Sequence, residues 1–209
     1  DHVTPKDAKL SVGEWCDKWL VGYGTRRKSS VRQAVTHIKI IKAHFENVPL
    51  SAVKPSDVRS WTAVLKDEGR ADSYVYSLHS RLSQLFTDAV HDGLVARNPC
   101  SRRTSPGMGK QRPYVATTRQ VWALYDAVPE GVRPAILLGA HAGLRLAEVA
   151  ALRVEVVDFV NGVVAPSSQW LDQPLKSDIS RTPIPIPKEM AHLLAEAIHL
   201  GDGHFLTSD

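Results

Sequence analysis

The stretch Ala142-Gly143-Leu144-Arg145-Leu146-Ala147-Glu148 lies inside an otherwise apolar helical region of this 209-residue chain. Gly143 permits a tight turn or a close approach of the backbone. Arg145 follows that turn, and Glu148 comes three residues later, where it can pair with Arg145 on one face of a helix. A guanidinium is permanently charged and presents a rigid fork that matches two phosphate oxygens. The stretch therefore predicts either a rigidly held anion-binding arginine or an ordinary surface Arg–Glu pair.

The residues around this stretch predict a mixed α/β unit. Helical periodicity runs through 118–128, 132–142 and 144–152, with Thr117 or Thr118 as the first cap. After residue 152 β-branched residues take over, and Asn161-Gly162 between two valine-rich runs is a strong hairpin signal. Prolines restrict 182–186 to an edge strand at best, and Pro187 starts a helix that we expect to end at about Leu200.

The first half of the chain predicts four amphipathic helices joined by short turns, which make a helical bundle. Ser11, with Glu14 three residues later, has the pattern of a capping box at the first helix. Apolar residues at every third or fourth position are assigned to the core, among them Val35 and Val64. The expected helices are Leu10–Tyr23, a second one capped by Ser29 or Ser30 and running to about Glu46, a third from Pro55 to Gly69, and a fourth from Asp72 or Ser73 to Gly93.

Residues 98–113 have a different composition. They are rich in Pro, Gly and Ser, contain no acidic residue and lack apolar periodicity, which is typical of an extended, exposed linker. A basic linker is suited to lie along a phosphate backbone, although a merely soluble linker has the same composition. We therefore expect a fold that is mostly α with a small antiparallel β-sheet (α+β). It comprises a helical bundle over 1–97, the linker over 98–113, and part of a mixed α/β domain over 114–209.

The charge of the chain is unevenly distributed. Residues 1–113 hold 19 Lys and Arg against 11 Asp and Glu, whereas residues 114–209 hold 7 against 11. A basic first half favours a polyanionic partner, because each phosphate that is neutralised releases counterions; an ordinary solvated surface remains the alternative. Cys16 and Cys100 are far apart, form no metal-ligand spacing, and are expected to be reduced.

Several segments together resemble the tyrosine recombinases, the phage integrase family. The run from Ala142 to Arg153 is similar to the first arginine signature of that family, and Lys176-Ser177-Asp178-Ile179-Ser180-Arg181 with Ile184-Pro185-Ile186 resembles the hairpin that carries its catalytic lysine. Thr118-Arg119-Gln120-Val121 resembles the opening helix of the catalytic domain, and Val156-Val157-Asp158 the strand after the arginine helix. The helical first half is similar to the core-binding domain, so the resemblance covers nearly the whole chain.

The resemblance implies roles for three residues. Arg145 would clamp the scissile phosphate, and Lys176, on a mobile β-hairpin, would protonate the departing 5′ oxygen as general acid. Glu148 would support Arg145. The implied reaction is site-specific DNA recombination, the integration or excision of phage or mobile-element DNA, through a 3′-phosphotyrosyl intermediate. It requires neither cofactor nor metal, because the covalent link conserves the energy of the phosphodiester bond.

The resemblance also implies partners and a setting. Double-stranded DNA at attachment or core sites would lie in a clamp formed by both domains, with four copies of the full-length protein assembled on it. Accessory DNA-bending proteins would fit this reading, and the setting would be the cytoplasm of a bacterial host, on DNA and away from membranes. The basic residues that we assign to DNA contact are Arg26, Arg27, Lys28, Arg32, Lys39, Lys42, Arg102, Arg103, Lys110 and Arg112.

The sequence departs from the family pattern after Lys176. The family requires a His-x-x-Arg motif, a further His or Trp, and a nucleophilic tyrosine beyond the lysine, whereas all five tyrosines of this chain precede Arg145. We therefore expect a fragment of a longer integrase that binds DNA and is inactive alone. Two alternatives remain: a naturally shortened, non-cleaving relative, and a helical DNA-binding regulator in which the Gly-Leu-Arg run is accidental.

Overall fold

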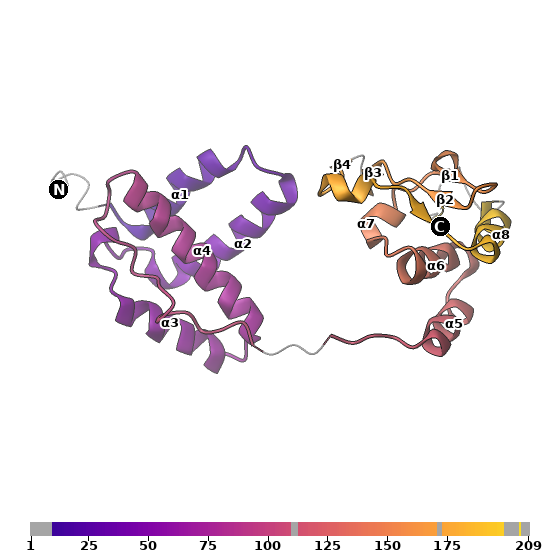
Figure 1. Ribbon diagram of the computed structural model, residues 1–209. Helices are drawn as coiled ribbons and strands as arrows, with labels where there is room; N and C mark the ends of the chain where they lie inside the picture. The colour runs from indigo at the N-terminus through magenta and orange to yellow at the C-terminus, as the bar shows by residue number, and fades with distance from the viewer. Residues whose placement is uncertain (1–9, 110–112, 171–172, 199–204, 206–209) are drawn as a thin grey trace. The chain divides into compact units, whose positions relative to one another are not determined.

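The computed structural model describes residues 10–109, 113–170, 173–198 and 205 of the chain. The chain divides into two units, Asp1–Arg112 and Pro113–Asp209 (Figure 1). Each unit has its own hydrophobic core. The first unit is helical, and the second combines helices with short antiparallel strands. The expected fold class, mostly α with a small antiparallel sheet, is confirmed.

The described residues 10–109 of the first unit form α1 (Val12–Tyr23), α2 (Lys28–Phe45), α3 (Pro55–Asp67) and α4 (Asp72–His91), with a 3-10 turn at Leu50–Ala52. Helix α2 packs against both α1 and α4, and α3 packs against α4. The capping box at α1 is confirmed: the Ser11 hydroxyl accepts from the Glu14 amide at 3.2 Å, and the Glu14 carboxylate accepts from the Ser11 amide at 2.8 Å. The prediction that Ser29 or Ser30 caps α2 is wrong, because the helix begins at Lys28, contains both serines, and has no side-chain cap.

The core of this bundle lies between the apolar faces of the four helices. Its fully buried large side chains include Trp61 and Ile41, which carry much of the apolar area removed from water. The assignment of Val35 and Val64 to the core is wrong, because these side chains are 50% and 45% exposed. In α2 the predicted stripe is buried at Ile38, Ile41 and Phe45, whereas Ala34 takes the inward position in place of Val35.

Residues 98–106, named here the strap, are not the extended linker that the composition predicts. The strap packs on α4: the Asn98 amide donates to the Ser83 carbonyl and to the Thr87 hydroxyl, both at 2.9 Å. Thr104, almost fully buried, is hydrogen-bonded to His79 at 2.9 Å, and Cys100 joins the bundle core. The side chains of Asn98 and Thr104 also satisfy the strap's own backbone amides, which lets a segment without periodicity lie on the bundle.

The second unit contains α5 (Thr118–Ala127), α6 (Arg133–His141), α7 (Leu146–Val149) and α8 (Lys188–Ala197). Its strands are β1 (Val157–Asp158), β2 (Val163–Val164), β3 (Ser168–Gln169), β4 (Gln173–Pro174) and β5 (Ile184–Pro185). Short 3-10 turns lie at Glu130–Val132, Val154–Val156 and Asp178–Arg181. One antiparallel sheet has the order β1-β2-β5, and β3 pairs with β4 in a separate hairpin.

In the second unit the predicted cap, edge strand and turn are found, whereas one predicted helix is much shorter than expected. Thr117 caps α5 as expected, and β5 is an edge strand. The turn predicted at Asn161-Gly162 joins β1 to β2 through the longer loop 159–162, with Gly162 at φ +63°. The helix predicted over 144–152 is only the four-residue α7, because Arg145 is still extended and the chain turns again before buried Leu152. The expected end of the last helix, near Leu200, lies outside the described residues.

Candidate functional site

Arg145 stands at a fixed point of the second unit because the chain on both sides of it is buried. Gly143 has φ +67°, a left-handed conformation that favours glycine, and it turns the chain out of α6. Leu144 is buried directly after this turn, and its amide donates to the Leu138 carbonyl at 3.2 Å. Val149, at the far end of α7, is also buried. The Arg145 side chain therefore projects from a backbone that is fixed on both sides, and 58% of that side chain is exposed.

Glu148 is the first partner of Arg145, as the spacing predicts. The backbone amide of Arg145 donates to Oε2 of Glu148 at 2.9 Å, and Nη1 of Arg145 donates to Oε1 at 2.8 Å. The Glu148 side chain is only 3% exposed, so both carboxylate oxygens of a buried acid are satisfied by one residue. This is more than a surface pair, because the acid holds both the backbone and the guanidinium of Arg145.

Ser180 is a second partner of Arg145 that the sequence does not reveal. Nη1 of Arg145 also donates to the Ser180 hydroxyl at 3.1 Å, across 35 positions of sequence. The Ser180 and Ser177 hydroxyls lie 3.2 Å apart. These serines belong to the run that starts at Lys176, so the structure brings the two motifs together. Nothing in the sequence around Ser180 indicates a contact with Arg145.

Lys176 lies beside this cluster in sequence, and it follows the β3–β4 hairpin rather than standing on it. It follows strand β4 by two residues, away from the β3–β4 turn, and its side chain is exposed. Leu175 before it is 5% exposed and fixes the chain at this point. Within the described part of the unit, no ion pair engages the Lys176 ammonium.

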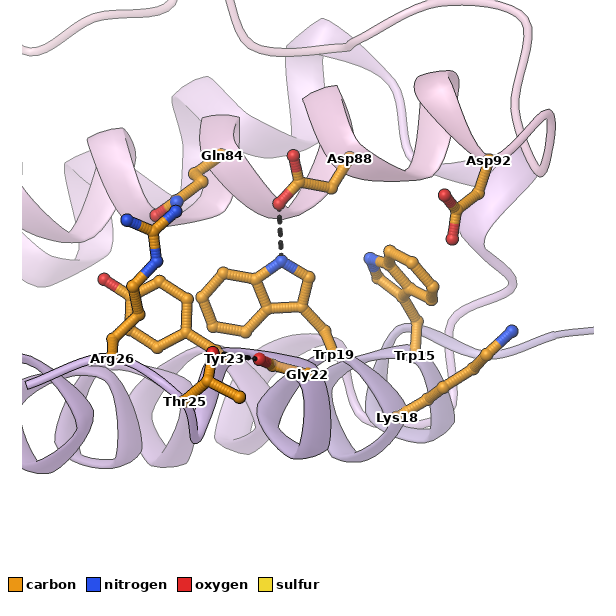
Figure 2. A pocket seen from close by; sticks show the side chains of 10 residues that line it. All are labelled: Trp15, Lys18, Trp19, Gly22, Tyr23, Thr25, Arg26, Gln84, Asp88 and Asp92. Carbon is orange, nitrogen blue, oxygen red and sulfur yellow. Dashed lines mark hydrogen bonds between the residues drawn. The ribbon is translucent and has the colours of Figure 1, made fainter.

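The basic residues assigned to the bundle are mostly exposed. Arg26, Arg27 and Lys28 lie at the turn between α1 and α2, and Arg32 and Lys39 lie on the outer face of α2. Figure 2 shows Arg26 beside Tyr23, at the edge of a pocket of about 410 Å³ in which Trp19 donates to Asp88 at 2.6 Å.

Lys42 differs from these residues. Its ammonium lies 2.9 Å from Asp17 and 3.3 Å from Glu46, and the hydrogen bond to Asp17 raises the Lys42 pKa. Its charge is therefore compensated within the bundle. A phosphate at this position would compete with these two carboxylates, and the phosphate contact of Lys42 stays a prediction.

The basic residues of the expected linker are distributed differently. Arg102 and Arg103 are exposed on the turn of the strap between Ser101 and Thr104. Lys110 and Arg112 lie outside the described residues. Throughout residues 10–109, 113–170 and 173–198, no group of three or more His, Cys, Asp or Glu side chains is placed to hold a metal ion. The same ranges contain no helix that is both long and apolar enough to span a membrane.

Comparison with known proteins identifies relatives of one kind. A protein of Mycobacterium tuberculosis named as an integrase of the prophage phiRv2 is 29% identical over 159 residues, which are 73% of this chain and 40% of that protein. The tyrosine recombinase XerC of Alcanivorax borkumensis is 29% identical over 117 residues, 53% of this chain and 38% of the relative. The matches thus span about two fifths of these relatives. No protein-family model matches the chain.

Solved structures agree with these relatives in fold. The Tn1549 transposon integrase in complex with a circular intermediate DNA superposes with a TM-score of 0.79 at 19% identity, over 93% of this chain and 66% of that one. A lambda integrase tetramer bound to a Holliday junction gives a TM-score of 0.77 at 19% identity, over 97% of this chain and 58% of that one. The resemblance to tyrosine recombinases and phage integrases is confirmed, in sequence by the relatives and in fold by these structures.

Proposed function

We propose that this chain is the DNA-binding and phosphate-clamping part of a tyrosine site-specific recombinase. The observation that carries the proposal is Arg145. Its guanidinium is exposed, yet it is held by buried Glu148 at 2.8 Å and lies beside the segment that contains Lys176. Positive charge fixed in advance is what a phosphoryl-transfer site needs, because negative charge accumulates on the phosphate in the transition state.

The proposed reaction of the complete recombinase proceeds in two balanced steps. A tyrosine hydroxyl attacks the scissile phosphorus, the P–O5′ bond breaks, and a 3′-phosphotyrosyl link forms while the 5′ oxygen takes a proton. Attack by a partner strand's 5′ hydroxyl then reverses the step and releases the tyrosine. Arg145 would neutralise the phosphate oxygens, Lys176 would supply the proton, and Glu148 would orient Arg145. No cofactor enters this scheme.

This chain alone would not perform that reaction. Its tyrosines, Tyr23, Tyr74, Tyr76, Tyr114 and Tyr125, all precede Arg145, and no His-x-x-Arg follows Lys176. We propose that the 209 residues bind DNA without forming a covalent adduct, and that cleavage requires the further motifs. Integration or excision of phage or mobile-element DNA is the proposed outcome, in the cytoplasm of a bacterial host.

The proposed partner is double-stranded DNA. Support comes from the excess of basic residues in the first unit and from the exposure of Arg26, Lys28, Arg32 and Lys39. The Tn1549 and lambda integrase structures are complexes with DNA, and one of them is a tetramer on a Holliday junction. We propose a tetramer of the complete protein on its core sites, with accessory DNA-bending proteins as further partners. Binding through phosphates makes the affinity fall steeply with salt.

Covalent trapping on nicked DNA tests the proposal. The complete recombinase, incubated with nicked attachment-site DNA and resolved on a denaturing gel, should yield a protein–DNA adduct. The Arg145→Ala variant should lose that adduct, whereas the matched variant Arg153→Ala should retain it. The 209-residue chain should shift DNA on a native gel and form no adduct. Undiminished adduct in Arg145→Ala would refute the clamp, and an adduct with the 209-residue chain would refute the assignment of the nucleophile.

A further inference from the structure

We propose that Ser180 is a positioning residue for Arg145, which determines the edge of the guanidinium that meets a phosphodiester. The inference rests on the proposed function of Arg145 as a phosphate clamp. It concerns a hydroxyl that lies in the Lys176 run and that no motif of the sequence singles out.

The hydrogen bonds of Arg145 divide its guanidinium into a used and an available edge. Nη1 carries two protons, and it donates to Glu148 at 2.8 Å and to Ser180 at 3.1 Å, so both protons are used. Among the described residues, no acceptor engages Nε or Nη2. These two nitrogens form one planar edge with parallel N–H bonds, the arrangement that binds two phosphate oxygens at once.

Glu148 alone does not fix this edge. A guanidinium held by one acceptor can pivot about that hydrogen bond, and 58% of the Arg145 side chain is exposed to solvent. Ser180 supplies a second acceptor for the same nitrogen, from a different segment of the chain. Two acceptors from separate segments restrict the plane of the guanidinium before any ligand binds, which reduces the entropy lost on binding.

The same hydroxyl connects Arg145 to the segment that contains Lys176. The Ser180 hydroxyl accepts from Arg145, and its own proton can be donated to Ser177, whose hydroxyl lies 3.2 Å away. The Ser180 amide donates to the Ser177 carbonyl at 3.1 Å, which closes the turn. Because Ser177 follows Lys176 directly, Ser180 holds the lysine segment and the arginine at one surface.

A double-mutant cycle on the 209-residue chain tests the inference, with a short fluorescein-labelled DNA duplex as the probe at low salt. Arg145→Ala should weaken binding roughly tenfold, the loss of one phosphate contact. Ser180→Ala should weaken it roughly threefold, near the lower end of what one hydrogen bond contributes, because Arg145 keeps its bond to Glu148. In the Arg145→Ala background, Ser180→Ala should add nothing, because its effect passes through the arginine. Ser180→Thr keeps the hydroxyl and should restore binding, and Ser167→Ala is the control.

The outcomes separate the two proposals. If Arg145→Ala weakens binding while Ser180→Ala does not, the positioning role of Ser180 is wrong and the clamp stands. If Arg145→Ala binds like the parent chain, the clamp fails and the role of Ser180 fails with it. Equal losses from Ser180→Ala in both backgrounds would also overturn the positioning role. Nitrogen-15 NMR of the Arg145 guanidinium gives a direct reading: slow rotation in the parent chain should become fast in Ser180→Ala.

Discussion

At the scale of single residues, the buried carboxylate of Glu148 shows how an exposed arginine is anchored to the protein. Glu148 is 3% exposed and accepts from both the backbone and the side chain of Arg145, so the acid acts as a cap and as a counterion at once. The Arg133–Glu130 pair has the same spacing, but its atoms are 3.5 Å apart and Glu130 is 68% exposed. The same spacing in sequence thus gives a buried, doubly hydrogen-bonded acid at Glu148 and a weak surface ion pair at Glu130.

This contrast makes a stability prediction. Glu148→Ala should lower the free energy of unfolding of the second unit by about 1–3 kcal/mol, because it removes a helix cap and leaves the Arg145 amide without its acceptor. Glu130→Ala, the matched control, should change it by about 0–1 kcal/mol. Urea unfolding followed by circular dichroism measures both values. Equal losses in the two variants would mean that burial of Glu148 does not matter.

His37 gives the first unit a dependence on pH. It is buried, its Nδ1 has no hydrogen-bond partner among the described residues, and it faces the ring of Tyr74. Burial, together with the positive charge of Arg81, lowers the His37 pKa below 6.5. Above pH 6.5 neither the folded nor the unfolded state binds the proton. Below pH 6.5 the unfolded state binds the proton first. The free energy of unfolding therefore decreases as the pH drops, until the pH passes the His37 pKa of the folded state.

Unfolding in urea at about pH 7.5 and about pH 5.5 checks this sign. The parent chain should be less stable at the lower pH, and His37→Leu should lose less stability over the same interval. His79, whose pKa burial also lowers, accounts for a remaining slope. His91, with a 90% exposed side chain, is the control, and His91→Leu should keep the parent slope. A parent chain that gains stability on acidification would contradict the assignment.

The residues of the site differ in how far the sequence predicts them. Arg145 and Glu148 are predictable because glycine, arginine and acid stand at a spacing that one helical turn brings together. Ser180 is not, because its contact spans 35 positions and depends on how a 3-10 turn packs. The pairing of Lys42 with Asp17 of α1 is not predictable either, because only the packed bundle brings these two positions together.

At the scale of elements, short segments are governed by tertiary contacts that periodicity does not contain. The long helices α1 to α4 were predicted well because each buries one continuous stripe. Helix α7, by contrast, has only four residues, since the turn at Gly143 and the buried Leu152 fix both of its ends. The strap lacks periodicity altogether, and Asn98 and Thr104 hold it on α4 by hydrogen bonds that composition cannot indicate.

Gly162 is the element-scale position where substitution should be most costly. Its φ is +63°, and a Cβ there would lie 2.7 Å from the Ile186 carbonyl oxygen, in the loop that joins β1 to β2. Gly143 has φ +67° but open space around the same position. Gly143→Ala should therefore cost about 1–2 kcal/mol for the backbone conformation alone. Gly162→Ala should cost clearly more, and thermal unfolding of both variants compares them. Equal costs would show that the backbone relaxes around Ile186.

At the scale of the whole molecule, the chain consists of two units with separate cores and opposite charge. The first unit holds 19 Lys and Arg against 11 acids, and the second holds 7 against 11. Composition predicted this division of charge directly. The boundary between Arg112 and Pro113 was harder to locate, because the strap reads as linker in sequence and belongs to the first unit in space.

The strap allows the two cysteines to report local opening separately from unfolding of the bundle. Both thiols are free and buried, and burial raises the pKa of each to about 12, so neither reacts as a thiolate while it is covered. Cys100 belongs to the strap and is buried because the strap packs on the bundle, whereas Cys16 is buried within α1. Detachment of the strap would uncover Cys100 while the four helices stay packed, so a thiol reagent should label Cys100 first and Cys16 only when the bundle unfolds. The interval between the two labelling events reports how much more easily the strap detaches than the bundle unfolds.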